Sequence, residues 1–231
     1  MKRLLLVLGI VWYLAVPEVQ AQNCLGVPVK EGGGFEMVSY DSKGKTTGTL
    51  LYKFKNVKTE GGATVIDMEF ESFDKKGTSQ LKNLYQMRCD GNQLVLDANS
   101  LVAMEQQRMF KDMNMKFTSS DIIYPGQLAV GQQLQDASIH GEGASGPLNV
   151  TFDMGMNNRK VEAQEKITVP AGTYDAYKVT SDMTVKTKMG MGMTMEAQSV
   201  SYRVPGVLWD VKSETYRKGK LLGYTELSKV F

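Results

Sequence analysis

The stretch Val65-Ile66-Asp67-Met68-Glu69-Phe70-Glu71 decides the fold. Its apolar side chains, Ile66, Met68 and Phe70, alternate with acidic ones. Successive residues of a β-strand point to opposite faces of the sheet, so this alternation predicts a strand with one apolar and one wet face. The same period recurs along most of the chain. We therefore expect a protein built almost entirely of strands.

Turn-forming residues separate the alternating runs at short intervals. Such residues occur at Asp41-Ser42-Lys43-Gly44, at Asp74-Lys75-Lys76-Gly77 and at Cys89-Asp90-Gly91-Asn92. Turns of the Asp-Gly and Lys-Gly type between alternating runs are typical of β-hairpins. The sequence thus predicts the all-β class, as a single antiparallel β-barrel or a strongly curved half-barrel or sandwich of roughly 10–14 strands.

Three segments depart from simple strand-turn-strand alternation. From Val185 to Ala197 one apolar phase continues for longer than a usual strand, so we expect a turn or bulge near Gly190–Gly192. Helix-forming residues without glycine or proline favour a short helix near 99–111. The glycine-rich stretch 140–146 is expected to form a loop.

The first residues have the pattern of a secretory signal peptide. Met1-Lys2-Arg3 is basic, Leu4–Leu14 is apolar, and Val19-Gln20-Ala21 resembles a cleavage site. We therefore predict a signal peptide over 1–21 and a single β-rich domain over 22–231. The protein is expected to be exported, to the periplasm, the outer membrane or the medium. No later apolar stretch approaches the roughly 20 residues that cross a bilayer as a helix.

Two cysteines, Cys24 and Cys89, follow the predicted cleavage site. An even number of cysteines in an exported chain favours a disulfide. The cross-link would close a loop of 89 − 24 = 65 positions, which corresponds to about 4 kcal/mol in the chain-entropy model. The alternative is lipidation of Cys24, but the bulky Asn23 before it does not fit a lipidation motif. We predict the disulfide.

Charge and motif content exclude several classes of function. Removing Lys2, Arg3 and Glu18 with the leader lowers the net charge from +2 to +1, which argues against a nucleic-acid partner. The single histidine, His140, lies near no nucleophile motif, and a zinc site of several histidines cannot be built from it. We therefore predict no catalytic residue, no metal site, no cofactor and no enzymatic activity.

Methionine is unusually frequent, with fifteen residues in the chain. It clusters at 113–115, at 154–156 and over 189–195. Three interpretations are open. These side chains could fill a core, they could form an adaptable apolar lining for a lipid-like ligand, or their thioethers could bind Cu(I).

The C-terminal half resembles a known family of envelope proteins. The segment Val169-Pro-Ala-Gly-Thr-Tyr-Asp-Ala-Tyr-Lys-Val179 is followed by Pro205-Gly206-Val207 and Val211-Lys212-Ser213-Glu214, and Tyr124-Pro125-Gly126 adds a middle segment. Together these stretches are similar to the TapB-like family, a 3108-like domain of unknown function found in exported proteins of Bacteroidetes. The resemblance implies a barrel or half-barrel related in shape to lipid-carrier folds, and it implies no catalytic residues.

These observations predict an exported, non-enzymatic β-protein that binds an apolar or amphipathic, lipid-like molecule. We expect the ligand to lie against one inner face, lined by the following residues: Ile66, Met68, Phe70, Met189, Met191, Met193 and Met195. The alternative is a structural or assembly factor of the envelope, with a filled barrel whose rim binds another envelope protein.

Overall fold

The computed structural model describes residues 22–98, 100, 102, 110 and 113–231. These residues form a small two-stranded sheet, β1 (Gln22–Cys24) with β2 (Val27–Val29), and one antiparallel sheet of thirteen strands. In sheet order the thirteen strands are β8 (Lys116–Ser119), β10 (Ala137–Ser145), β11 (Leu148–Val169), β12 (Gly172–Met189), β13 (Met191–Arg203), β14 (Asp210–Arg217), β15 (Lys220–Val230), β3 (Gly34–Asp41), β4 (Thr46–Glu60), β5 (Ala63–Asp74), β6 (Ser79–Cys89), β7 (Gln93–Leu96) and β9 (Ile122–Pro125). The predicted all-β class is confirmed.

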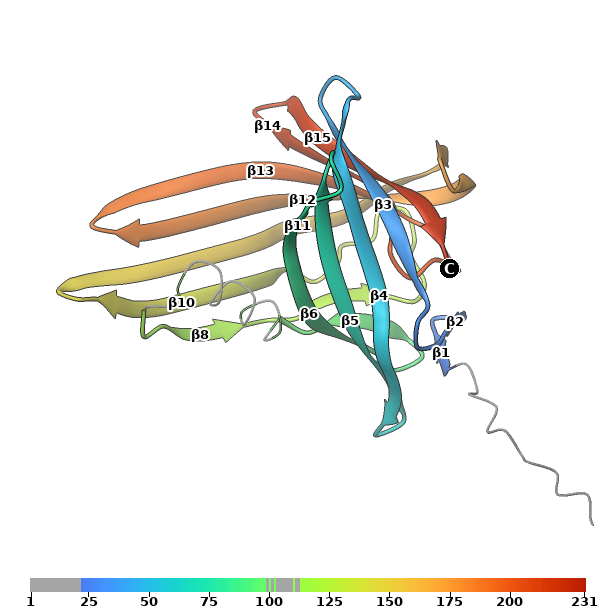
Figure 1. The fold of residues 1–231 in the computed structure, drawn as a ribbon, viewed down its shortest axis with the longest axis horizontal. Coiled ribbons are helices and arrows are strands. Elements are labelled where there is room, and N and C mark those ends of the chain that lie inside the picture. The colour runs from blue at the N-terminus through green and yellow to red at the C-terminus, as the bar shows by residue number, and fades with distance from the viewer. Residues whose placement is uncertain (1–21, 99, 101, 103–109, 111–112) are drawn as a thin grey trace, which may run out of the picture.

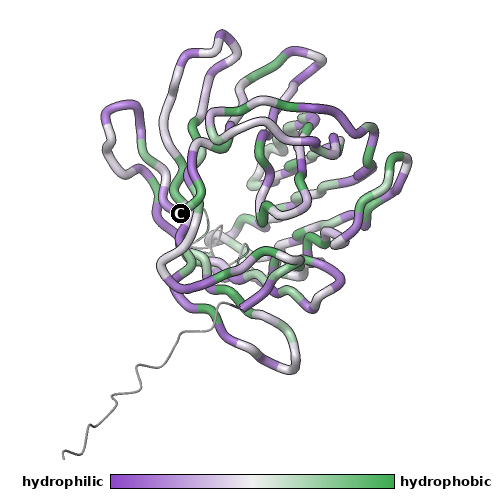
Figure 2. Tube along the Cα trace, turned by 90° about the vertical axis from the view of Figure 1, so that its right-hand side faces the viewer, coloured by the Kyte–Doolittle hydropathy of each residue, from purple (hydrophilic) through white to green (hydrophobic). Residues whose placement is uncertain are grey.

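The sheet curves so strongly that its two edge strands can follow each other directly in the sequence. The edge strands are β8 and β9, and only residues 120–121 separate them. A sheet whose edges are joined by two residues must curl back on itself, as the ribbon and the perpendicular view of the trace show (Figures 1 and 2). β8 and β9 are not hydrogen-bonded neighbours in the described sheet. The molecule is therefore a strongly curved half-barrel rather than a closed barrel.

Short Asp and Gly turns form the predicted hairpins. The Asp41 carboxylate accepts the backbone N–H groups of Lys43 at 2.8 Å and Lys45 at 2.9 Å, and Gly44 has a φ of 76°. Such a positive φ is tolerated best by glycine. Asp74 and Gly77 form the same turn between β5 and β6. Local sequence therefore specifies these reversals.

The predicted turn in the methionine-rich segment is also confirmed. β12 ends at Met189, β13 begins at Met191, and Gly190 between them has a φ of 77°. Because Met189 lies directly opposite Met191, every odd-numbered residue from 183 to 197 shares one face of the hairpin. The long single phase in the sequence is thus two strands folded on each other.

The main core is aromatic and lies between the β3–β7 half of the sheet and the β13–β14 connection. Phe35 stacks on Tyr52 with ring centroids 4.5 Å apart, and Trp209 lies 5.8 Å from Phe35 and 5.4 Å from Tyr52. Burial raises the pKa of Tyr85, as it raises that of Tyr52, so both phenols stay neutral inside this core.

The predicted disulfide is confirmed. Cys24 and Cys89 are bonded, with Cα atoms 5.4 Å apart, and both are buried in the main core. The bond ties the β1–β2 hairpin to the end of β6. The signal peptide predicted over 1–21 lies outside the described residues, as does most of the helix predicted near 99–111. No described helix is long and apolar enough to span a membrane.

Candidate functional site

The ends of β10–β13 that extend away from the main core, which we call the arm (137–145, 148–157, 182–189 and 191–198), carry one apolar face. Cross-strand pairing aligns this face in three rows. From the inner row outward, these are Ile139, Met154, Val185 and Met195; then Gly141, Phe152, Thr187 and Met193; then Gly143, Val150, Met189 and Met191. We call this surface the methionine face.

The opposite face of the arm is polar. His140, Asp153, Lys186 and Thr194 form one of its cross-strand rows. Each strand of an antiparallel pair alternates between the two faces, so the arm is apolar on one side and wet on the other. The apolar side of such a sheet is normally covered, either by other parts of the protein or by a bound molecule.

Half of the methionine face is covered by the protein itself. Val102, Phe110 and Met115 are buried and pack on the part of the face formed by β10 and β11. The ring of Phe110 lies 5.3 Å from that of Phe152, edge to face. Geometry of this kind adds stabilisation beyond the buried area.

Two glycines of β10 let neighbouring side chains approach the methionine face closely. A Cβ atom on Gly141 would lie 2.5 Å from a carbon of the Phe117 ring, and one on Gly143 would lie 2.6 Å from the sulfur of Met115. The loop predicted over 140–146 is therefore wrong. This segment is mostly the strand β10, and its glycines make room for neighbouring side chains.

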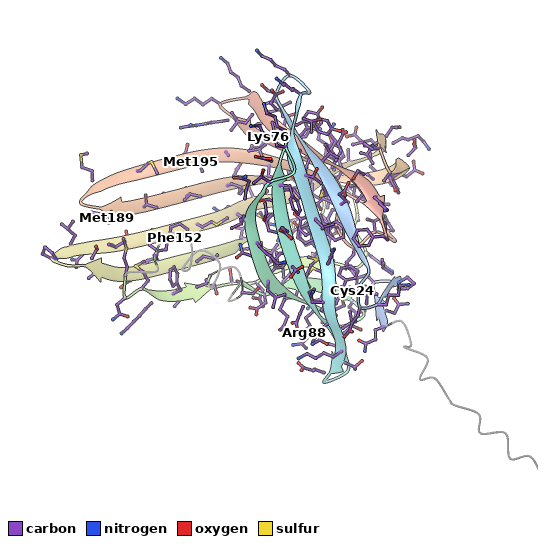
Figure 3. All side chains as sticks on the ribbon, in the orientation of Figure 1. Cys24, Lys76, Arg88, Phe152, Met189 and Met195 are labelled. Carbon is purple, nitrogen blue, oxygen red and sulfur yellow. A yellow bond between two sulfur atoms is a disulfide. The ribbon has the colours of Figure 1, made fainter. Side chains whose placement is uncertain are left out.

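The other half of the methionine face is open. The exposed fractions are 51% for Met189, 91% for Met191, 65% for Met193 and 46% for Met195. Figure 3 shows Met189 and Met195 on the β12–β13 hairpin, away from the densely packed β3–β6 half. Leu148 is also exposed, at the turn that joins β10 to β11. Exposed apolar side chains gathered in this way mark interaction sites.

The structure separates the residues predicted to line one ligand face. Ile66 and Met68 are fully buried in the main core, and Phe70 packs there with its ring 5.0 Å from that of Tyr52. The four methionines Met189, Met191, Met193 and Met195 lie together, but on the arm. The structure does not bring the two groups together, because alternation groups side chains within a strand and does not say which region of a curved sheet they reach.

The β11 part of this site carries a sequence signal that was not among the predicted site residues. Val150, Phe152 and Met154 alternate with Thr151 and Asp153, which is the same signal that identified β5. The loop predicted over 140–146, just before this stretch, hid its continuity with the methionine hairpin.

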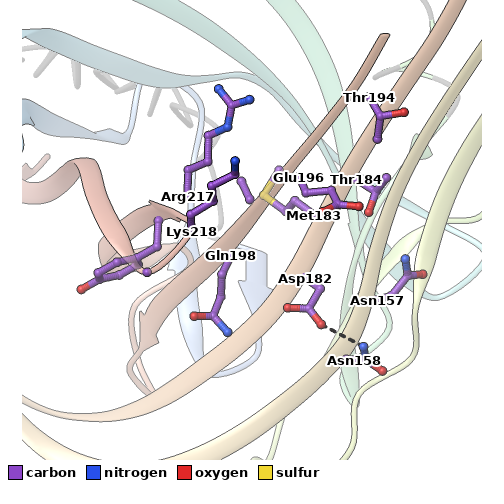
Figure 4. A pocket seen from close by; sticks show the side chains of 13 residues that line it. Asn157, Asn158, Asp182, Met183, Thr184, Thr194, Glu196, Gln198, Arg217 and Lys218 are labelled. Carbon is purple, nitrogen blue, oxygen red and sulfur yellow. Dashed lines mark hydrogen bonds between the residues drawn. The ribbon is translucent and has the colours of Figure 1, made fainter. Parts of the chain in front are cut away.

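A polar cleft lies on the other side of the arm and has a volume of about 840 Å³. Asn157, Asp182, Gln198 and Tyr216 form a cross-strand row along it, and Arg217 and Lys218 reach it from the β14–β15 turn (Figure 4). Asn158 donates a hydrogen bond of 2.9 Å to Asp182. Most of these side chains are exposed, so the cleft is a wet concavity of the sheet.

His140 lies on the polar face between two carboxylates. Its Nδ1 atom is 2.6 Å from Asp153 Oδ1, and its Nε2 atom is 2.8 Å from Glu142 Oε1. These hydrogen bonds raise the pKa of His140, with the bond to Asp153 contributing most. The described residues contain no group of three or more His, Cys, Asp and Glu side chains placed to hold a metal ion.

Comparison with known proteins identifies the family. The model of the DUF3108-like family matches residues 30–227, so the chain belongs to that family. No curated protein matches the sequence.

Two solved structures share the fold. One, from Parabacteroides distasonis, is named as a candidate lipoprotein. It is 23% identical, with a TM-score of 0.67, and the match covers 91% of this chain and 100% of that one. The other, from Bacteroides fragilis, is named as a candidate exported protein with a YmcC-like fold. It is 18% identical, with a TM-score of 0.66 and coverage of 89% and 98%. At these identities the likeness establishes the fold alone.

Proposed function

We propose that this protein is an exported, non-enzymatic envelope protein that binds an apolar or amphipathic, lipid-like molecule on the methionine face. The proposal rests on one observation: side chains of the protein cover half of that face, and the other half is exposed to solvent. The names of the two structural relatives support an envelope location, and the resemblance to TapB-like proteins is the finer family assignment that we propose.

The energetics favour a flexible apolar ligand. Covering apolar surface contributes about 25 cal/mol per Å² before the costs of ordering the ligand. Methionine is unbranched and polarisable, so its side chains adapt to ligands of different shape. Since Met191 and Met193 are largely exposed, ligand contact would bury them without disrupting an existing core.

Neighbouring residues on β13 provide a matched test. Met193 and Thr194 are both exposed and adjacent, but they lie on opposite faces of the arm. A titration with the neutral fluorescent probe N-phenyl-1-naphthylamine would compare Met193→Glu with Thr194→Glu. We expect the first change to weaken binding at least about tenfold, because it places a charge against the apolar ligand. Thr194→Glu adds the same charge to the polar face and should leave the affinity unchanged. Equal effects of the two changes, or none, would contradict the proposal.

A second candidate is an assembly factor that binds another envelope protein. The aromatic main core is filled by its own side chains, which favours this alternative for the β3–β7 half. Size-exclusion chromatography of the protein with envelope extract, before and after the extract is treated with protease, would separate the two functions. A bound species that survives proteolysis is expected for the lipid-like ligand.

Cu(I) binding by the methionine thioethers is a third candidate. Met189 and Met191 are direct cross-strand partners, so two sulfur atoms lie on one face. Met→Leu changes at both positions keep the volume and remove the sulfur. They would abolish Cu(I) binding, whereas binding of an apolar probe would persist.

A further inference from the structure

A separate cavity of about 320 Å³ lies beside the β1–β2 hairpin. This hairpin lies at the other end of the molecule from the arm tips (Figure 1). The cavity is bounded by the β1–β2 hairpin, the segment that follows β9 and the end of β13. Its apolar walls include Leu25, Val27, Leu128, Val204, Val207 and Leu208. This volume lies within the usual range for small-molecule sites.

A buried arginine, Arg203, forms part of the wall of this cavity. Its Nη1 atom donates a hydrogen bond of 2.7 Å to Asp210 Oδ1, and its Nη2 atom donates one of 3.3 Å to the Leu208 carbonyl. The guanidinium group also lies over the ring of Tyr124, 3.9 Å from the centroid. Arg203 is thus held in place at the wall of a cavity that offers both apolar and polar surface.

The charges around Tyr124 do not balance. A second buried guanidinium, that of Arg159, lies 4.6 Å from the centroid of the same ring. Its Nη1 atom donates to the carbonyls of Ile123 and Gln135, but its Nη2 atom has no hydrogen-bond partner among the described residues. Burial raises the pKa of Tyr124, so this phenol supplies no negative charge. Asp210 is hydrogen-bonded to Arg203, so one carboxylate stands against two guanidinium groups that share the ring of Tyr124.

An unbalanced buried charge is costly, because it has lost its hydration without gaining a counter-charge. We propose that the cavity binds a small amphipathic anion, such as a medium-chain carboxylate. Its head would lie beside Arg203, which lines the cavity whereas Arg159 does not, and would offset the net positive charge of the two guanidinium groups. Its tail would lie along the apolar walls. The inference does not depend on the methionine face.

The disulfide fixes one wall of this cavity. Leu25 follows Cys24 directly, and its positive φ of 53° turns it in the tight β1–β2 connection. The opposite wall approaches closely, since a Cβ atom on Gly126 would lie 2.9 Å from Leu25 Cδ2. A wall held by a covalent bond keeps the cavity formed before a ligand arrives, which lowers the ordering cost of binding.

Isothermal titration of the full mature protein with decanoate, and separately with 1-decanol, tests the proposal. We expect decanoate to bind with one-to-one stoichiometry and at least about tenfold more tightly than the alcohol. Val207→Trp fills the cavity from a half-exposed loop and should abolish decanoate binding while the thermal midpoint stays unchanged. If this variant does not fold, Leu128→Trp fills the same cavity from its other wall.

The double change Met191→Glu/Met193→Glu separates this site from the methionine face. It should abolish binding of the neutral naphthylamine probe and leave decanoate binding intact. Three results would overturn the inference: no saturable decanoate binding, equal affinity for decanoate and decanol, or decanoate binding that is lost in the methionine variant and kept in Val207→Trp. Failure of the naphthylamine experiment alone bears only on the methionine face.

Discussion

Val150 and Met189 lie directly opposite each other on β11 and β12, yet Val150 is 3% exposed and Met189 is 51% exposed. They belong to the same row of the same sheet face. The boundary between the covered and the open half of the methionine face therefore runs between these two strands. The cover formed by Val102, Phe110 and Met115 extends over β11 but leaves the outer part of β12 and β13 exposed.

Shortening a side chain should lower the free energy of unfolding more on the covered side of this boundary than on the open side. Phe152→Ala removes a buried ring that packs against Phe110, and we expect it to lower the free energy of unfolding by about 3–5 kcal/mol. Met193→Ala, in the same row but exposed, should change it by less than about 0.5 kcal/mol. Urea denaturation of both variants measures this difference. Similar values for the two would contradict the boundary.

The disulfide should make a large contribution to stability. Cys24 and Cys89 close a loop with a sequence separation of 65, so the Cys24→Ser/Cys89→Ser variant should lose about 4 kcal/mol. In the unreduced protein, neither thiol should react with iodoacetamide after unfolding, and both should react once a reductant is added. Alkylation without reductant would show that the bond is absent.

His140 provides a pH probe that is unique in the chain. Its carboxylate partners raise its pKa above the ordinary value of 6.5, so an NMR titration of its ring protons should have a midpoint above that value. Asp153→Asn removes the largest cause and should lower the midpoint. Because the folded-state pKa is raised, the stabilisation is fully present below the unfolded-state pKa. It is lost as the pH rises through the folded-state pKa. A midpoint at or below that of an unfolded peptide would contradict the pairing.

The charge cluster around Tyr124 predicts that neutralising Asp210 destabilises the protein more than neutralising Asp182. Asp210→Asn leaves the buried guanidinium group of Arg203 without its carboxylate and should cost about 3–5 kcal/mol of unfolding free energy. Asp182→Asn removes an exposed acid that is hydrogen-bonded to Asn158, and it should cost no more than about 1 kcal/mol. Thermal unfolding of the two variants measures the contrast, and equal losses would show that Asp210 does not neutralise buried charge.

Features that depend on neighbouring residues could be predicted from the sequence. The alternation of Ile66, Met68 and Phe70 specified β5, and the turns at Gly44, Gly77 and Gly190 were fixed by residues that tolerate a positive φ. The disulfide followed from the number of cysteines and the predicted compartment.

Features that depend on the curvature of the sheet could not be predicted. Gly141 and Gly143 suggested a loop, because the side chains of Phe117 and Met115 that explain them come from another part of the chain. Likewise, Ile66 and Met191 show the same alternation, but only the three-dimensional register places one in the aromatic core and the other on the open arm. The Arg203–Asp210 pair became visible only when β13 and β14 were aligned.

The central claim, that a lipid-like ligand covers the methionine face, is tested most directly by oxidising the methionines with hydrogen peroxide and following each residue by peptide mass spectrometry. Met191 and Met193 are among the most exposed of the described methionines and should oxidise rapidly in the free protein. With saturating N-phenyl-1-naphthylamine, we predict that both are oxidised several-fold more slowly, while the buried Met68 stays unreactive in either case. Unchanged oxidation of Met191 and Met193 in the fully occupied protein would contradict the claim.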